Sequence, residues 1–353
     1  YGTPSRETEQ SALAAAATQL GHAMMWKQKG PEATEAYATA IAYDPQGFNY
    51  NQCFQLLASA TKAPEEERPC GFRAALELAH ERFSQRAPAG DPRAVALSWW
   101  LGWARFNDAD WNRAEEGFLG AAESANSWFY IGLARHYRHD SAGGVAAMHK
   151  GWELDPVSMV SEAASAGGAL RAFEGLIAWC ANEEPAKNLD AAFLSELLAQ
   201  AFPGNPRYWN NVGLFLRDEG ENLEIAAHKA KTTPPDAALL SDLYNRSYKA
   251  YQRALELDPA DPQLQNDTAL MLHYHFESDQ AEVEGLYRRA LELVEAKLAA
   301  ADLTEDDRAR FEQTKTDIDT NLENLLHPEK AKEEAAAEAA AEAAAEASAD
   351  GGQ

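Results

Sequence analysis

Residues 128–156 read WFYIGLARHYRHDSAGGVAAMHKGWELDP, and this stretch indicates two helices separated by a polar turn. Small and large apolar residues recur in it at offsets that suit a close helix crossing. They are Trp128, Ile131, Gly132, Gly144, Met148 and Gly151, followed by Pro156. Small residues let two helices approach closely, and a large residue fills the space beside them. The final proline ends the second helix, because it lacks an amide hydrogen and restricts the residue before it.

The same offsets recur elsewhere in the chain. A Leu-Gly or Ile-Gly pair is followed by a small residue 12 positions after the glycine, an aromatic residue or Met four positions later, and a small residue three positions after that. One further set is Leu20, Gly21, Ala33, Tyr37, Ala40 and Pro45, and another is Leu101, Gly102, Ala114, Phe118 and Ala121. Asp-Pro endings at Pro156 and Pro259 lie 103 residues apart, close to three periods of about 34 residues.

This pattern resembles the tetratricopeptide repeat (TPR) family over roughly residues 12–296, with three units matching at nearly every signature position. The resemblance implies an all-α, right-handed superhelical solenoid of about seven antiparallel helix pairs. It also implies that the first helix of each pair lines a concave surface.

The predicted pairs are 11–29 with 31–44, 47–61 with 67–86, 92–106 with 111–124, 126–139 with 142–154, 158–182 with 188–201, a sixth beginning at Arg207, and 262–277 with 280–299. A capping helix is predicted over 304–326, with Thr304 as its N-cap and an apolar stripe to close the last repeat. That stripe consists of Phe311, Ile318, Leu322 and Leu325. We therefore expect a flexible segment at 1–10, a solenoid over 11–327, and an acidic, partly helical Ala/Glu-rich tail at 328–353.

An insertion interrupts the sixth unit. Its second helix arrives 22 residues later than the other units predict, which places the extra residues near 219–240. Insertions in repeat proteins form loops or extra turns on one face, often a binding face. A tolerated surface loop is the interpretation we favour here, and a binding element is the alternative.

Glu256, Asp258 and Asp261 stand close together and resemble a metal or acid–base site. In the repeat frame, Asp258 and Pro259 end one unit. Asp261, before Pro262, suits the N-cap of the next helix. We interpret the cluster as helix punctuation rather than as an ion site.

The composition narrows the classes of partner. The formal net charge is −25, which disfavours nucleic acid and anionic membranes and favours basic protein partners. No apolar run is long enough to span a bilayer. The chain begins at Tyr1 without a methionine, so it is either processed and extracytoplasmic or simply trimmed and cytoplasmic. Cys53, Cys70 and Cys180 are interpreted as small buried side chains, with a Cys53–Cys70 disulfide as the alternative.

The sequence lacks the common catalytic signatures. The sequence has no Gly-rich phosphate loop, no G-x-S-x-G elbow and no H-E-x-x-H motif, so we predict no enzyme, no cofactor and no metal site. His136 and His139 are three apart on a predicted helix, a spacing compatible with metal ligation, whereas His273 and His275 are two apart and face different sides of theirs. A histidine-dependent metal-binding regulator or enzyme is therefore the least favoured alternative.

The inward positions of the first helices define a candidate peptide-binding groove. These residues are Trp26, Trp99, Trp103, Phe106, Phe129, His136, Tyr137, Asn210, Arg217, Asn266, His273 and Tyr274. Aromatic side chains facing a concavity can anchor peptide side chains, and amides can pair with a peptide backbone. The alternative is that the aromatics pack against one another inside the repeats.

We accordingly predict a non-catalytic scaffold that binds a partner's peptide or helix in this groove. The rival is a structural subunit that packs through the faces or ends of the solenoid. Concentration-dependent size would favour the rival.

Overall fold

The computed structural model describes residues 6–58, 70–87, 90–165, 167–233 and 235–330. Within these ranges the chain is all-α and divides into two compact units, residues 1–179 and 180–353. Most consecutive helices pack against one another along each unit, which confirms the predicted all-α repeat architecture. The predicted acidic tail at 328–353 lies outside the described residues from position 331 onward. Every helix in the described ranges is too short or too polar to cross a lipid bilayer.

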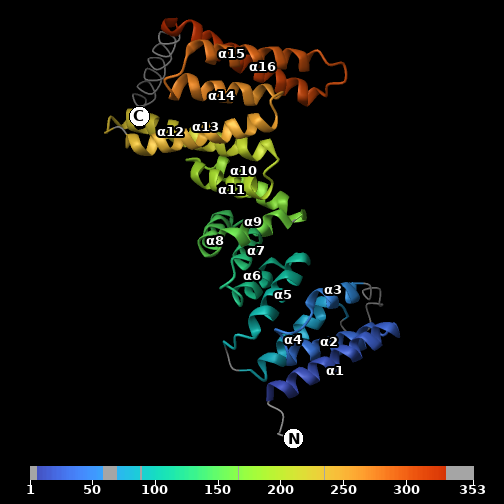
Figure 1. Ribbon diagram of the computed structural model, residues 1–353. Coiled ribbons are helices and arrows are strands. Elements are labelled where there is room, and N and C mark those ends of the chain that lie inside the picture. The colour runs from blue at the N-terminus through green and yellow to red at the C-terminus, as the bar shows by residue number, and fades with distance from the viewer. Residues whose placement is uncertain (1–5, 59–69, 88–89, 166, 234, 331–353) are drawn as a thin grey trace, which may run out of the picture. The chain divides into compact units, whose positions relative to one another are not determined.

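The first unit contains most of the predicted pairs (Figure 1). Its helices are α1 (Arg6–Trp26), α2 (Gly30–Tyr43), α3 (Tyr50–Ala58), α4 (Phe72–Ser84), α5 (Ala94–Asn107), α6 (Trp111–Leu119), α7 (Ala125–Tyr137), α8 (Ser141–Leu154), α9 (Pro156–Ser165), the 3-10 turn η1 (Gly167–Ala169) and α10 (Leu170–Asn182), whose end belongs to the second unit. Helix α1 begins within the segment expected to be flexible. The single helix expected over 158–182 is broken by Gly167, whose φ of +40° disfavours any residue with a side chain.

The second unit continues with long helices and the end helix. They are α11 (Asn188–Ala201), α12 (Pro206–Ala230), α13 (Ala237–Leu257), α14 (Pro262–His275), α15 (Gln280–Leu298) and α16 (Glu305–Leu326). Figure 1 shows α14, α15 and α16 side by side, in agreement with their contacts. The predicted stripe of α16 is buried together with Tyr287 and Val294 of α15. Thr304 accepts a hydrogen bond from the amide of Asp307, as predicted for an N-cap.

The glycine signature acts at the helix crossings. A Cβ atom on Gly102 would lie 2.8 Å from the backbone nitrogen of Phe118, and one on Gly21 would lie 2.6 Å from the ring of Tyr37. A Cβ atom on Gly132 would lie 2.9 Å from the side chain of Met148. The pairs are therefore held at a separation that only glycine permits.

The insertion is helical, so the favoured interpretation of a surface loop is wrong for most of it. Helix α12 runs for 25 residues and α13 for 21, and the added residues form extra turns where the two helices join. Gly213 still meets an aromatic ring, since its added Cβ would lie 2.7 Å from Tyr251. Ser247 stands at the small-residue position and donates to the Gly213 carbonyl at 2.7 Å. The insertion thus lengthens the pair without moving its crossing.

The acidic cluster around residue 258 is helix punctuation, as predicted. Asp261 is the N-cap of α14 and accepts hydrogen bonds from the amides of Gln263 and Leu264. Asp258 follows the last turn of α13 as its C-cap. Cys53 and Cys180 are buried and Cys70 is half-buried, and none of the three forms a disulfide in the described structure. Burial raises the pKa of the Cys53 thiol to about 12, which keeps it a neutral core residue.

Candidate functional site

A polar pocket of about 510 Å³ lies among α12, α14 and α16 of the second unit. Helix α12 contributes Asn210, Leu214 and Arg217, which are spaced three or four residues apart and so share one face. The remaining lining residues are Gln263, Asn266, Asp267 and Leu270 of α14 and Asp317, Thr320 and Asn321 of α16. Three residues predicted as inward-facing, Asn210, Arg217 and Asn266, therefore meet in one cavity.

The end helix closes one side of this pocket through polar contacts with α14. The side-chain amide of Asn321 donates to Oδ1 of Asn266 at 3.1 Å, and the Thr314 hydroxyl donates to Oε1 of Gln263 at 3.1 Å. Nearer the end of α14, Asn324 donates to the Tyr274 hydroxyl at 3.2 Å. Helix α16 thus both seals the last repeat and supplies part of the pocket wall.

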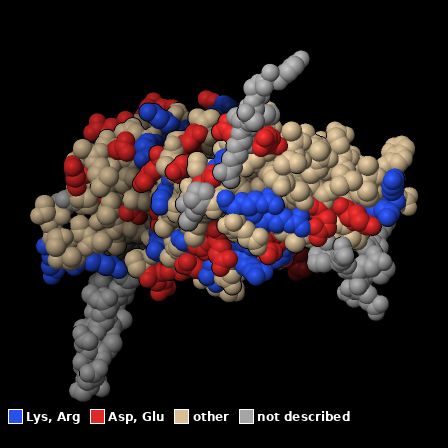
Figure 2. Space-filling view, turned by 90° about the horizontal axis from the view of Figure 1, so that it is seen from below, with Lys and Arg blue, Asp and Glu red and all other residues tan. Residues whose placement is uncertain are grey.

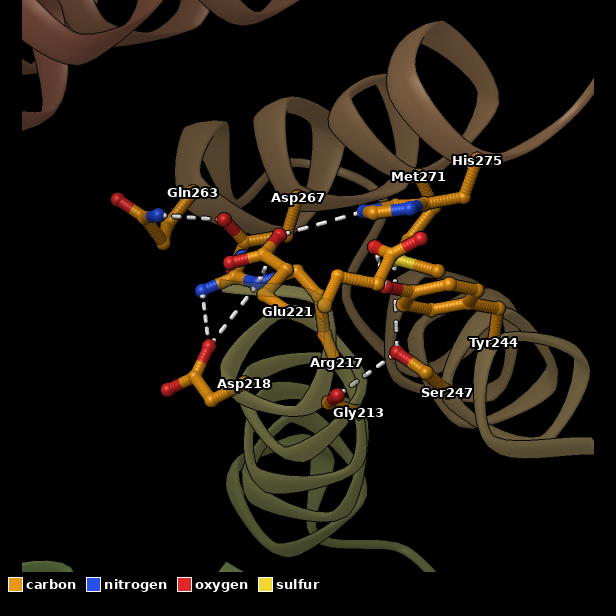
Figure 3. A network of polar contacts seen from close by, with 11 residues as sticks. Gly213, Arg217, Asp218, Glu221, Tyr244, Ser247, Gln263, Asp267, Met271 and His275 are labelled. Atoms are coloured by element: carbon orange, nitrogen blue, oxygen red, sulfur yellow. Dashed lines mark hydrogen bonds and ion pairs between the residues drawn. The ribbon is translucent and has the colours of Figure 1, made fainter. Parts of the chain in front are cut away.

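Arg217 is the basic residue of the pocket lining, and acidic groups surround it (Figure 3). Its guanidinium donates twice to Oδ1 of Asp218, at 2.7 and 3.1 Å, and Nε lies 3.6 Å from Oε1 of Glu221. Burial raises the pKa of Asp218, and the neighbouring Arg217 opposes that shift. The guanidinium is therefore engaged by its own helix.

Asp267 is the buried acid of the pocket. Its side chain is 5% exposed, and Oδ1 accepts a hydrogen bond from Nε2 of Gln263 at 2.7 Å. Burial raises the pKa of Asp267 to about 6, although Arg217, Gln263 and Asn266 each lower it. Burial therefore outweighs the stabilisation that the Arg217 charge and the two amides give the ionised carboxylate, and a further cation placed beside it would stabilise the ionised form.

A second set of contacts fixes Glu221 from its other side. Nε2 of His275 lies 3.2 Å from Oε1 of Glu221, and the His275 ring stacks on Tyr244 with centroids 3.9 Å apart. The Tyr244 hydroxyl donates to Glu224 at 2.6 Å. These residues come from α12, α13 and α14, and Figure 3 shows Glu221, Tyr244 and His275 beside Arg217. The network holds the acidic side of α12 in place.

Most of the aromatic residues predicted to line a groove lie in the first unit, where they largely pack against one another. Phe129 is 1% exposed and Phe106 is 8% exposed, so both are core residues. They do not line an open groove, contrary to the prediction from the sequence. Trp103 contacts the rings of Phe54 and Phe72, with centroids 5.2 and 6.4 Å away. These side chains contribute their apolar area to the fold instead of offering it to a ligand.

Trp99 and Tyr137 are also engaged by other rings. Trp99 meets Trp100 edge-on at 5.0 Å, and Tyr137 stacks on Trp111 at 4.3 Å while remaining 39% exposed. Trp111 comes from the second helix of its pair, so counting inward positions on first helices missed it. The alternative of mutual packing describes these aromatics better than the groove does.

The remaining predicted residues are scattered. Trp26 is 90% exposed at the end of α1, and Tyr274 is 50% exposed. Nδ1 of His136 lies 2.8 Å from the Ser141 hydroxyl, and Nδ1 of His273 lies 3.3 Å from the hydroxyl of Tyr287. Burial lowers the pKa of both histidines. Among the described residues, no three His, Cys, Asp or Glu side chains lie together in a way that could hold a metal ion.

The charged surface does not by itself define a site. On the face shown in Figure 2, Asp and Glu side chains are interspersed with Lys and Arg. The excess negative charge of the chain is therefore not a single acidic patch on that face.

The fold and the pocket define a TPR-like all-α repeat protein. No protein-family model matches the chain, and no curated protein matches it. Among solved structures, it is similar to MamA, with 14% identity over 61% of this chain and 98% of that one and a TM-score of 0.35. It is also similar to an IFIT1 monomeric mutant with Gppp-AAAA (13%, 91% and 77%, TM-score 0.29) and to the TPR2AB domain of yeast Sti1 in its pHSP90 complex (13%, 87% and 99%, TM-score 0.22). Because these similarities are low, the TPR-like description rests on this chain's own helix pairs and glycine crossings.

Proposed function

We propose that the chain is a protein-interaction scaffold that binds an extended peptide segment of a partner in the polar pocket of its second unit. The observation that carries this proposal is the convergence of Asn210, Arg217 and Asn266 with the polar face of α16 around one cavity. Its volume of about 510 Å³ lies within the range of binding pockets for small ligands or a few side chains.

The lining suits an extended backbone. Asparagine and glutamine side chains each carry donors and an acceptor, the same complement that a peptide group offers. Leu214 and Leu270 supply apolar surface between these amides. An extended segment can pair its backbone with such side chains, whereas the backbone groups of a helix are already bonded to one another.

The aromatic groove of the first unit is not retained as the binding site. Phe106 and Phe129 are buried, and Trp103 packs among other rings. A peptide would have to displace ring contacts worth about 0.5–1.5 kcal/mol for each pair before it gained any of its own. The pocket among α12, α14 and α16 requires no such displacement.

The test uses a random peptide library displayed on phage and selected against the full chain. Thr320 lies on the exposed rim of the pocket, so Thr320→Tyr should fill the entrance without disturbing α16. Thr316→Tyr is the matched control, since Thr316 is exposed on the same helix and also bonds the carbonyl four residues earlier. We expect selected peptides to bind the Thr320 variant at least about tenfold more weakly and the Thr316 variant normally. Equal binding to both variants would remove the pocket from the proposal.

A structural role is the second candidate, and one separate observation favours it. Leu13 and Leu20 lie one heptad apart on α1 and are 49% and 50% exposed, and Trp26 at the end of that helix is 90% exposed. Exposed apolar stripes of this kind mark contact surfaces. If α1 joins copies of the chain, light scattering will show a mass that rises with concentration and a Leu20→Glu variant that stays monomeric. A concentration-independent monomeric mass rejects this role.

A further inference from the structure

We propose that the pocket of the second unit takes a basic side chain of the bound segment, arginine or lysine, and holds its charged head against Asp267 and the side-chain oxygen of Asn210. This inference rests on the proposed function, because it names the chemical group that the same pocket recognises. It explains which partner the pocket selects, whereas the amides explain only how a backbone is held.

The charges around the pocket exclude an anionic group. One guanidinium, that of Arg217, lies near the carboxylates of Asp218, Glu221 and Asp267, and the carboxylate of Asp317 lines the same pocket. Its hydrogen bonds run to Asp218, and Glu221 lies 3.6 Å away. A ligand carboxylate or phosphate would therefore meet repulsion from these carboxylates. A ligand cation would meet attraction from the carboxylates, which outnumber the one guanidinium that repels it.

The hydrogen-bonding capacity left in the pocket points the same way. Gln263 already donates to Asp267, and Asn321 already donates to Asn266. Within the described part of the chain, Oδ1 of Asn210 is buried and has no donor. A buried acceptor without a donor is unfavourable, because it has lost its hydrogen bonds to water. A ligand rich in N–H groups and poor in acceptors removes this cost, and a guanidinium or ammonium group has that character.

Proton binding by Asp267 should be linked to this recognition. Charged or titratable groups face it from each helix of the unit that packs around it. They are Arg217, Asp218 and Glu221 of α12, Tyr251 of α13, Asp261 before α14, Tyr287 of α15 and Asp317 of α16. An incoming cation stabilises ionised Asp267 and lowers its pKa. Below about pH 6, binding must first remove the proton, so affinity should fall by up to about tenfold for each pH unit.

The experiment uses the peptides selected on the full chain. Each is resynthesised with its arginines replaced by citrulline or its lysines by norleucine, which removes the charge and keeps the length. We expect neutralisation at one position to weaken binding at least about tenfold at about pH 7.5, and much less at about pH 5. The Asp267→Asn variant should bind charged and neutral peptides nearly equally. Asp242→Asn, which removes an exposed carboxylate of α13, should keep the preference for the charged peptide.

The outcomes separate the two proposals. If peptides are blocked by Thr320→Tyr but bind equally well after neutralisation, the basic anchor is refuted and the peptide pocket stands. If binding ignores Thr320→Tyr, both are refuted. The comparison of charged and neutral peptides on the unmodified chain decides the question even if Asp267→Asn fails to fold.

Discussion

Replacing Asp267 with asparagine should change how the stability of the second unit depends on pH. The pKa of Asp267 is raised from an ordinary value near 3.8 to about 6, chiefly by burial. A carboxyl group whose pKa is higher in the folded state binds more protons there than in the unfolded chain. It therefore stabilises the fold fully below about pH 4, and this contribution is lost as pH rises through about 6. A shift of roughly two units corresponds to about 3 kcal/mol.

Asparagine does not titrate, so the Asp267→Asn variant should escape this loss. We expect the free energy of unfolding of the variant, relative to the unmodified chain, to increase by about 3 kcal/mol between about pH 4 and about pH 7.5. Urea unfolding followed by far-UV circular dichroism at several pH values measures it. Asp242→Asn serves as the control for removing one acidic charge from the same unit. A difference that stays constant with pH, or that decreases, refutes the reasoning about Asp267.

Three further predictions concern stability. Arg217→Met removes the cation that lies near Asp267 and should destabilise the fold by about 3–5 kcal/mol at neutral pH, with a smaller loss near pH 4, in the same urea assay. Gly102→Ala places a methyl group 2.8 Å from the backbone nitrogen of Phe118 and should lower the melting temperature. Gly285→Ala places a methyl group in open space and should raise the free energy of unfolding by about 0.5–1 kcal/mol. Equal effects of the two substitutions would contradict the close helix crossing at Gly102. Trp103→Ala should cost about 3 kcal/mol of unfolding free energy, and an unchanged stability would return Trp103 to the groove.

The repeat offsets predicted the fold because they mark the positions where two crossing helices leave no room for a larger side chain. Gly102 and Gly132 face the ring or sulfur side chain that the offset names, since a helix crossing at that distance excludes a Cβ atom. The same reasoning located the insertion, and Tyr251 follows Gly213 with the expected delay. It did not predict that the insertion is helical, because residues 219–230 lack the repeat signature and the repeat spacing indicates only how many residues are added. Their helical form follows from continuing the two helices that flank them.

The candidate site was predicted only in part. An offset indicates the direction of a side chain, but its exposure depends on the neighbouring repeat. Phe129 points inward and is nevertheless buried beside Phe173 of α10, a partner that no offset names. Asp317, Thr320 and Asn321 looked like an ordinary solvated face of α16, because the sequence indicated only that its other face was apolar. They line the pocket only because α16 packs against α14, as the hydrogen bond from Asn321 to Asn266 shows.

The central claim is that a partner segment binds in the pocket among α12, α14 and α16. Hydrogen exchange with mass spectrometry, comparing the free chain with the chain saturated by a selected peptide, tests it most directly. The account predicts slower exchange confined to the lining segments of Pro206–Ala230, Pro262–His275 and Glu305–Leu326, with no change in Ala94–Asn107 or Ala125–Tyr137. Slower exchange in those two aromatic helices, with none around the pocket, would contradict it.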